Sequence, residues 1–320
     1  MSHPSPVEGL WFDDGTLVLQ AGNWAFRVYG GFLAQRSPVF HDMLQFPQPV
    51  DCDTMDSCPV VQLSDDKRDL EYFLRALFDH EFFPPYPAKT EFRTISGVLR
   101  LSTKYQVDSL RKRALIHLSS YFPSDPVEYP TVSDSSSWIL EGPEWLRVVL
   151  LGKEMGLDWI LPLAFYRTVA YCSAEQILNG APFDEEVNVE LDAADKLLCL
   201  EQSIALTTSA SSAVIDFLWE PSVLPGCEGR DDREQWKCTK SRYSSRKMME
   251  KWRSIAYPLK LWVPEDWADL SPVCGSCLAS MKTAHTAAVR LLWDSLPQRF
   301  GLGDWATLEQ IKANALEGSP

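Results

Sequence analysis

Residues 13–40, DDGTLVLQAGNWAFRVYGGFLAQRSPVF, decide the fold of the first part of the chain. Thr16–Leu19 is rich in strand-forming residues, and Gly22–Asn23 favours a tight turn. Residues 24–28 then alternate in the manner of a second strand. The pattern predicts a β-hairpin within residues 10–29.

Helical patterns follow the hairpin and continue to residue 122. Ser37–Pro38 is typical of a helix start, because the hydroxyl caps free N–H groups and proline fits the first turn. After a proline-containing loop, Val60–Leu63 predicts a third strand, and Ser64–Asp65 is the expected cap of the next helix. Apolar residues spaced by three and four then predict helices around residues 70–78, 95–102 and 110–121.

The rest of the chain also has a helical pattern. Residues 123–142 carry prolines and a serine run, which is typical of a linker. We expect a helical domain over residues 143–220 and, after a proline- and glycine-containing loop, a second helical region over residues 221–310. A polar tail is expected to close the chain. No repeat with a period of about 20–50 residues supports a solenoid.

Composition excludes several classes of protein. The 320 residues predict two or three domains, and 45% hydrophobic with 23% charged residues is an ordinary globular balance. Lys plus Arg number 30 and Asp plus Glu 44, so the net charge is −14, which opposes nucleic-acid binding by the whole protein. The start resembles no signal peptide, and no apolar run predicts a membrane helix. We therefore expect an intracellular protein, cytoplasmic or nuclear, without a membrane partner.

Five segments within residues 10–122 form an ordered series: Asp13–Leu19, Phe26–Tyr29, Leu33–Phe40, Val61–Asp65 and Leu99–Val107. Their order and spacing resemble the BTB/POZ family. Details of the start and of the C-terminal half are similar to the BTB proteins expanded in mushroom-forming fungi. The resemblance implies an α+β domain, a small sheet covered by helices, followed here by a mostly α-helical region. It also implies homodimerisation or binding to a scaffold such as a cullin.

One residue departs from the family pattern. Tyr29 stands where the family usually has a histidine, at the end of the second strand. We expect the fold to be kept, because a tyrosine can pack there and still place its hydroxyl. The imidazole, and any partner contact made through it, is missing.

Four cysteines in the last third of the chain are the candidate metal ligands. Cys227 and Cys238 are separated by ten residues, and Cys274 and Cys277 by two. Zinc takes four such ligands in a tetrahedron, and a Cys-x2-Cys knuckle supplies two from one tight turn. Gly275–Ser276 suits that turn, and a helix from about Leu278 would bring its N–H groups close to the thiolates. The sequence favours a structural Zn²⁺, with free thiols or disulfides as alternatives.

A catalytic zinc is not expected, because it keeps an open position and usually has histidine or carboxylate ligands. His285 lies about 12 Å along the predicted helix from the Cys-x2-Cys knuckle, which is too far to share the metal. It falls in an apolar series and is expected to be a core or interface residue.

Residues 236–253 form a basic helical segment. Its cations are Lys237, Lys240, Arg242, Arg246, Lys247, Lys251 and Arg253. They could contact nucleic acid or an acidic partner. We favour the simpler interpretation, a solvated face that also offsets the charge of nearby thiolates.

The pattern as a whole predicts a non-enzymatic protein-interaction protein. Signature motifs of nucleotide-binding proteins, serine hydrolases and zinc proteases are absent from the sequence. One alternative is a substrate adaptor of a cullin-based ubiquitin ligase, although no kelch, MATH or ankyrin-type reader is visible. A second is a nuclear transcriptional regulator that uses the basic helix on DNA, which the net charge opposes.

Overall fold

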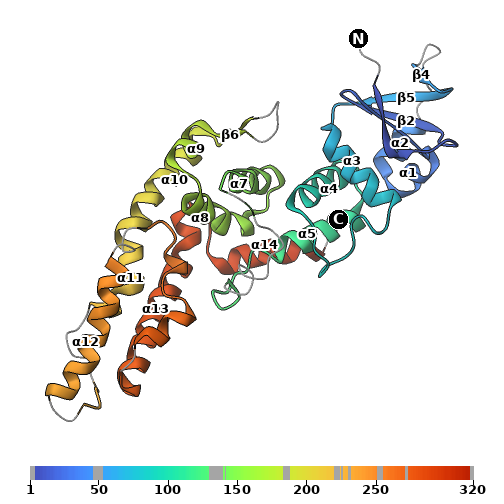
Figure 1. Ribbon diagram of the computed structural model, residues 1–320. Coiled ribbons are helices and arrows are strands. Elements are labelled where there is room, and N and C mark those ends of the chain that lie inside the picture. The colour runs from blue at the N-terminus through green and yellow to red at the C-terminus, as the bar shows by residue number, and fades with distance from the viewer. Residues whose placement is uncertain are drawn as a thin grey trace. The chain divides into compact units, whose positions relative to one another are not determined.

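The computed structural model describes residues 4–45, 53–129, 140, 142–182, 188–219, 224, 226–229, 232–250, 255–270 and 273–317. The chain is a mixed α/β protein with a small sheet near its N-terminus (Figure 1). It divides into two compact units, the first mainly residues 1–123 and the second mainly residues 139–312. Among the described residues, no helix combines the length and apolar character needed to cross a membrane.

The first unit is built on a sheet with the strand order β1-β3-β2-β5-β4 among the described residues. The strands are β1 (Ser5–Trp11), β2 (Leu17–Ala21), β3 (Trp24–Val28), β4 (Thr54–Met55) and β5 (Cys58–Leu63). β2 and β3 pair antiparallel, which confirms the predicted hairpin. β2 also pairs in parallel with β5, so the chain crosses over between them through two helices.

Two strands of this sheet were missed by the sequence prediction. β1 pairs in parallel with β3, and β4 pairs with the start of β5. Most of β1 is exposed or partly exposed, so its sequence shows little of the apolar alternation that identifies a half-buried strand. β4 is two residues long, which is too short for any periodicity.

The central strands are buried on both faces. Val18 packs with Ala25 and Cys58 on one face, where Trp11 and Val60 add partly buried surface. The neighbours of Val18 along β2 point to the opposite face, because side chains alternate in a strand, and they too are almost fully buried.

Helices make up most of the described part of residues 1–123 outside the sheet. They are α1 (Gly30–Arg36), α2 (Pro38–Gln45), α3 (Lys67–Phe78), α4 (Phe92–Lys104) and α5 (Asp108–Ser119). The predicted start of α2 is confirmed, because the Ser37 hydroxyl accepts a hydrogen bond from the Phe40 N–H at 3.1 Å. The cap of α3 is Asp66 and not Ser64–Asp65. Asp65 instead accepts hydrogen bonds from Lys104 and from the hydroxyl of Tyr105.

The second unit is mostly helical. Its α-helices include α7 (Glu144–Met155), α8 (Leu161–Tyr171), α9 (Ala174–Asn179), α10 (Ala193–Ala205), α11 (Ser211–Ile215), α12 (Asp232–Met249) and α13 (Gly275–Arg299). Short turns of other helix types are η1 (Asp158–Ile160), η2 (Leu206–Ala210), η3 (Asp216–Leu218), η5 (Pro258–Lys260) and η6 (Pro264–Leu270). A small hairpin joins β6 (Ala181–Pro182) to β7 (Asn188–Val189).

Two features mark the organisation after residue 123. The predicted helical segments 143–220 and 221–310 lie in one compact unit. The expected polar tail contains a helix, α14 (Trp305–Glu317). Most of the predicted linker, residues 123–142, falls outside the described residues.

The end of α13 is fixed by a proline and a glycine. Pro297 has no N–H to donate to the carbonyl of Trp293, and this oxygen accepts a hydrogen bond from Nε1 of Trp305 at 2.9 Å. Gly301 has φ +69°, and the Leu302 N–H bonds back to the Pro297 carbonyl at 2.9 Å. This is a Schellman ending, which needs a left-handed residue at the glycine position.

Candidate metal centre

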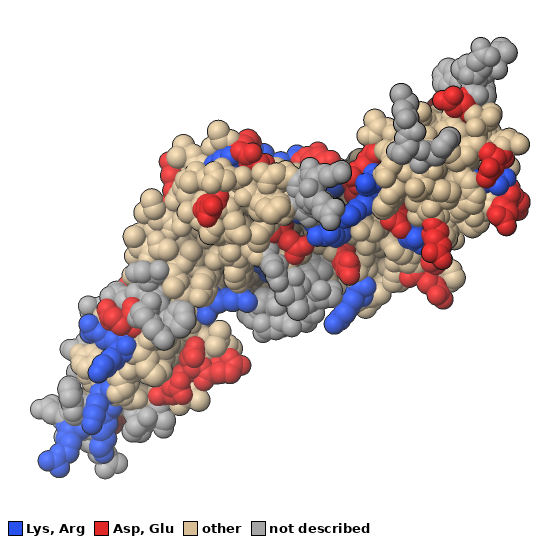
Figure 2. All heavy atoms as spheres, turned by 45° about the horizontal axis from the view of Figure 1, so that its top comes forward, with Lys and Arg blue, Asp and Glu red and all other residues tan. Residues whose placement is uncertain are grey.

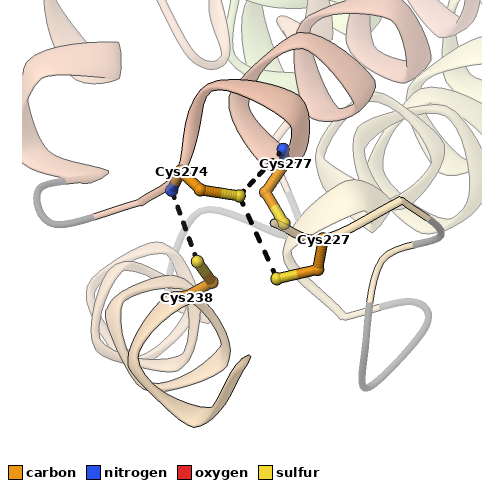
Figure 3. Close-up of side chains that lie close together, drawn as sticks. All are labelled: Cys227, Cys238, Cys274 and Cys277. Atoms are coloured by element: carbon orange, nitrogen blue, oxygen red, sulfur yellow. Dashed lines mark hydrogen bonds between the residues drawn. The ribbon is translucent and has the colours of Figure 1, made fainter. Parts of the chain in front are cut away.

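The structure brings the four predicted cysteines together. Cys274 and Cys277 lie at the start of α13, Cys238 lies on α12, and Cys227 lies on the loop before α12 (Figure 3). Their four Sγ atoms all lie within 4.8 Å of one another. Cys227 and Cys274, which are 47 positions apart in the sequence, therefore have neighbouring sulfur atoms in the fold.

The sulfur spacing matches a tetrahedral metal site. The Sγ atoms of Cys227 and Cys274 are 4.0 Å apart. With a Zn–S bond of about 2.3 Å, two ligands at a tetrahedral angle lie about 3.8 Å apart. A disulfide would need about 2.05 Å between the same two atoms. The arrangement can therefore accept a metal ion without a large movement, and this pair is not disulfide-bonded.

Cys274 and Cys277 are positioned by the helix start itself. Cys274 is the N-cap of α13, and its Sγ accepts a hydrogen bond from the Cys277 N–H at 3.5 Å. The helix begins at Gly275, three residues before the predicted start at Leu278. Gly275–Ser276 therefore belongs to the first helical turn, and the expected separate tight turn is wrong. The reason is that a cysteine sulfur can cap a helix, as serine or aspartate oxygens do.

Cys227 is held by a turn that depends on glycine. Gly226 has φ +77°, and a Cβ there would lie 3.3 Å from Oγ of Ser276. The following residue, Glu228, joins this loop to α13. Its N–H donates to Sγ of Cys274 at 3.5 Å, and its carboxylate accepts the Ser276 N–H at 3.1 Å. Sequence reasoning missed Glu228, because a backbone N–H leaves no signal in the residue type.

Backbone N–H groups favour the thiolate form of one ligand. Burial works to raise the pKa of Cys274, but hydrogen bonds from the N–H groups of Glu228 and Cys277 outweigh it and lower the pKa to about 7. Burial raises the pKa of Cys238, whose sulfur accepts the Cys274 N–H at 3.3 Å, and of Cys277. Such N–H···S bonds are the outer-shell contacts that orient metal ligands.

The surroundings of the sulfur atoms combine apolar side chains with one buried cation. Leu224, Val273 and Met281 line the small cavity beside the cysteines. Arg242 also lines it from α12 and is only 2% exposed. A buried guanidinium beside four thiolates would offset part of their negative charge, as expected for the basic segment.

The remaining basic residues of α12 lie mostly on its surface. Lys237, Lys240 and Lys247 are exposed, which fits the predicted solvated face. Lys251 and Arg253 lie outside the described residues.

His285 lies apart from the cysteines, as predicted. Its ring packs against Phe217 and Trp267 at centroid distances of 5.8 and 5.7 Å, and its Nε2 lies 3.3 Å from the Leu261 carbonyl oxygen. Burial lowers the pKa of His285, which favours the neutral ring. It is a core residue of the second unit. Among the described residues, the four cysteines are the one group of three or more potential ligands placed closely enough for a metal.

Comparison with known proteins adds no relative. A scan against protein-family models matched none of them, and a search of curated proteins returned no match. The fold and the cysteine cluster are therefore the features that bear on function.

Proposed function

We propose that the chain is a non-enzymatic protein-interaction protein. Its first unit, a BTB/POZ-like domain, would bind a second copy of the chain, and a structural Zn²⁺ would hold α12 to the start of α13. The proposal assigns the interaction to one unit and the metal to the other.

The sheet topology carries the first half of the proposal. After β1, the chain forms a hairpin, two helices, the two-residue strand β4, a strand parallel to the first strand of the hairpin, and three more helices. The BTB/POZ resemblance implies two strands, two helices, a third strand and three helices, so β1 and β4 are additions to this order. Tyr29 fits as expected, since its hydroxyl donates to Asp14 at 2.6 Å and its ring stacks on Phe12 at 5.0 Å.

Aromatic side chains offer a contact surface on this unit. Phe78 lies 5.5 Å from Phe12, 6.3 Å from Tyr29 and 5.0 Å from Phe32, measured between ring centroids. All four rings are partly exposed. A contiguous apolar patch of this kind favours protein contact, and aromatic residues are enriched in such interfaces. We call these four residues the aromatic patch.

The patch leads to a test of dimer formation. By light scattering, we expect the purified wild-type chain to have twice the mass of a monomer. The Phe32→Glu variant should be monomeric, because the substitution weakens association at least about tenfold. A carboxylate at position 32 must be desolvated when the patch is buried, even though Arg36 of the same helix lies over this position. Gln35→Glu is the matched control, because Gln35 is exposed on the same helix. The control should remain dimeric.

Thermal unfolding of both variants separates loss of association from loss of fold. A wild-type monomer, or a Phe32→Glu variant that stays dimeric, contradicts the proposed homodimer. A monomer that binds the N-terminal domain of a cullin would instead favour the adaptor function.

The four sulfur atoms carry the second half of the proposal. Four cysteine thiolates fill a zinc tetrahedron completely and leave no position for water or substrate, which is the composition of a structural site. The ligands come from a loop, from α12 and from α13. An ion bound there would join α12 and the loop before it to the start of α13, with 36 positions between Cys238 and Cys274. Zinc would thus fix the orientation of α12 within the second unit.

A further inference from the structure

The exposed side of α12 carries a regular row of basic residues. Arg233, Lys237, Lys240 and Lys247 are all exposed and follow one another at intervals of four, three and seven residues. At 3.6 residues per turn, these intervals place all four on one side of the helix. We call these four residues the basic stripe. On the same side of the helix, the exposed and uncharged Ser244 lies between Lys240 and Lys247.

The opposite side of the helix is anchored. Cys238 points to the other cysteines, and Thr239, Arg242 and Ser245 are buried. The basic stripe therefore faces away from the four cysteines. The helix could not turn the stripe inward without moving Cys238 away from the other three. Figure 2 shows Lys and Arg side chains gathered at the lower left, in the region where Figure 1 places α12.

The charges of the stripe are not used within the described part of the chain. None of its four residues forms an ion pair with another described residue. By contrast, Lys153 and Lys196 elsewhere in the same unit each bind nearby carboxylates. A row of like charges on one helix face is destabilising by itself, so an anionic partner would relieve the repulsion.

We propose that the basic stripe binds a short acidic peptide segment of a partner protein. The stripe is about 21 Å long at about 1.5 Å per residue, which an extended segment of about six residues would match. Met248 is 57% exposed next to Lys247 and provides an apolar contact at one end. A flexible methionine suits a variable apolar side chain in the bound segment.

The acidic surroundings select a short partner over a nucleic acid. Element η6 packs against α12 and carries Glu265 and Asp269, both exposed. The protein as a whole has a net charge of −14. A duplex would continue past the stripe and meet this negative surface, whereas a short peptide need not.

The test uses fluorescence anisotropy with the full chain. The probe is a fluorescein-labelled peptide of about ten residues, rich in glutamate with a central leucine, and the reference probe has glutamine for every glutamate. The stripe variant is Lys237→Gln, Lys240→Gln and Lys247→Gln together. The matched control removes three exposed lysines that lie outside α12, Lys89→Gln, Lys112→Gln and Lys282→Gln.

We expect the wild type and the control to bind the acidic peptide and not the reference peptide. The stripe variant should bind the acidic peptide at least about tenfold more weakly, because several ion pairs are lost together. Equal affinities of the two triple variants, or no binding by the wild type, would overturn the proposal. Tighter binding of a duplex DNA of about 20 base pairs at the same salt concentration would overturn the choice of partner.

Discussion

We expect the double variant Cys274→Ser, Cys277→Ser to be purified with less than about one tenth of the zinc bound by the wild type, which should carry about one ion per chain. A serine hydroxyl is not a soft, ionised ligand, so two of the four corners of the tetrahedron are lost. A structural zinc site contributes an apparent binding free energy of about 10–16 kcal/mol. The loss should therefore loosen the contact between α12 and the start of α13.

Elemental analysis measures the metal, and hydrogen exchange measures the loosening. The control is Cys172→Ser, because the Cys172 thiol is buried away from the cluster and donates to the Gly142 carbonyl at 2.8 Å, which a hydroxyl can also do. The control should keep its zinc. A double variant that retains full zinc, or a wild type that is metal-free with a well-protected α12, would show that the cysteines are ordinary thiols.

Trp293→Ala should lower the free energy of unfolding of the second unit by about 3–5 kcal/mol. Trp293 has no exposed surface and stacks on Trp305 at 5.4 Å, with Tyr129 at its edge at 5.5 Å. Its Nε1 donates to the Ser124 carbonyl at 2.7 Å. Alanine removes the ring, leaves a cavity and deprives that carbonyl of its donor.

Two further variants divide this effect into parts. Trp293→Phe keeps most of the ring and loses the hydrogen bond, so we expect a loss of about 1–2 kcal/mol. Leu291→Ala should change stability by less than about 0.5 kcal/mol, because Leu291 is 72% exposed on the same helix. Urea unfolding followed by circular dichroism measures all three variants. Similar losses for Trp293→Ala and Leu291→Ala would contradict the role of Trp293 in the core.

Local pattern was enough to predict elements with a strong signal in their own residues. The hairpin of β2 and β3 has strand-forming residues on both sides of a Gly–Asn turn, and the helix α3 has a repeating apolar side. β1 was missed because its position depends on pairing with β3 more than on its own mostly exposed residues. In α14, Leu308 is the one buried residue among its described side chains, so the helix resembled a polar tail.

The candidate site was predicted by residue type, and its details required the fold. The two-residue spacing of Cys274 and Cys277 indicated one half of the cluster. The wide spacing of Cys227 and Cys238 left open whether these residues are the other two ligands. The structure places Cys227 on a loop and Cys238 on the following helix. The contacts of Glu228 depend on three-dimensional proximity, which no spacing rule reveals.

X-ray absorption at the zinc edge of the purified chain tests the central claim, that the four cysteines form one metal site. A structural site made by these residues predicts four sulfur neighbours at about 2.3 Å from a single zinc ion. A folded chain without zinc, or a zinc ion whose neighbours are mainly nitrogen and oxygen, would contradict it.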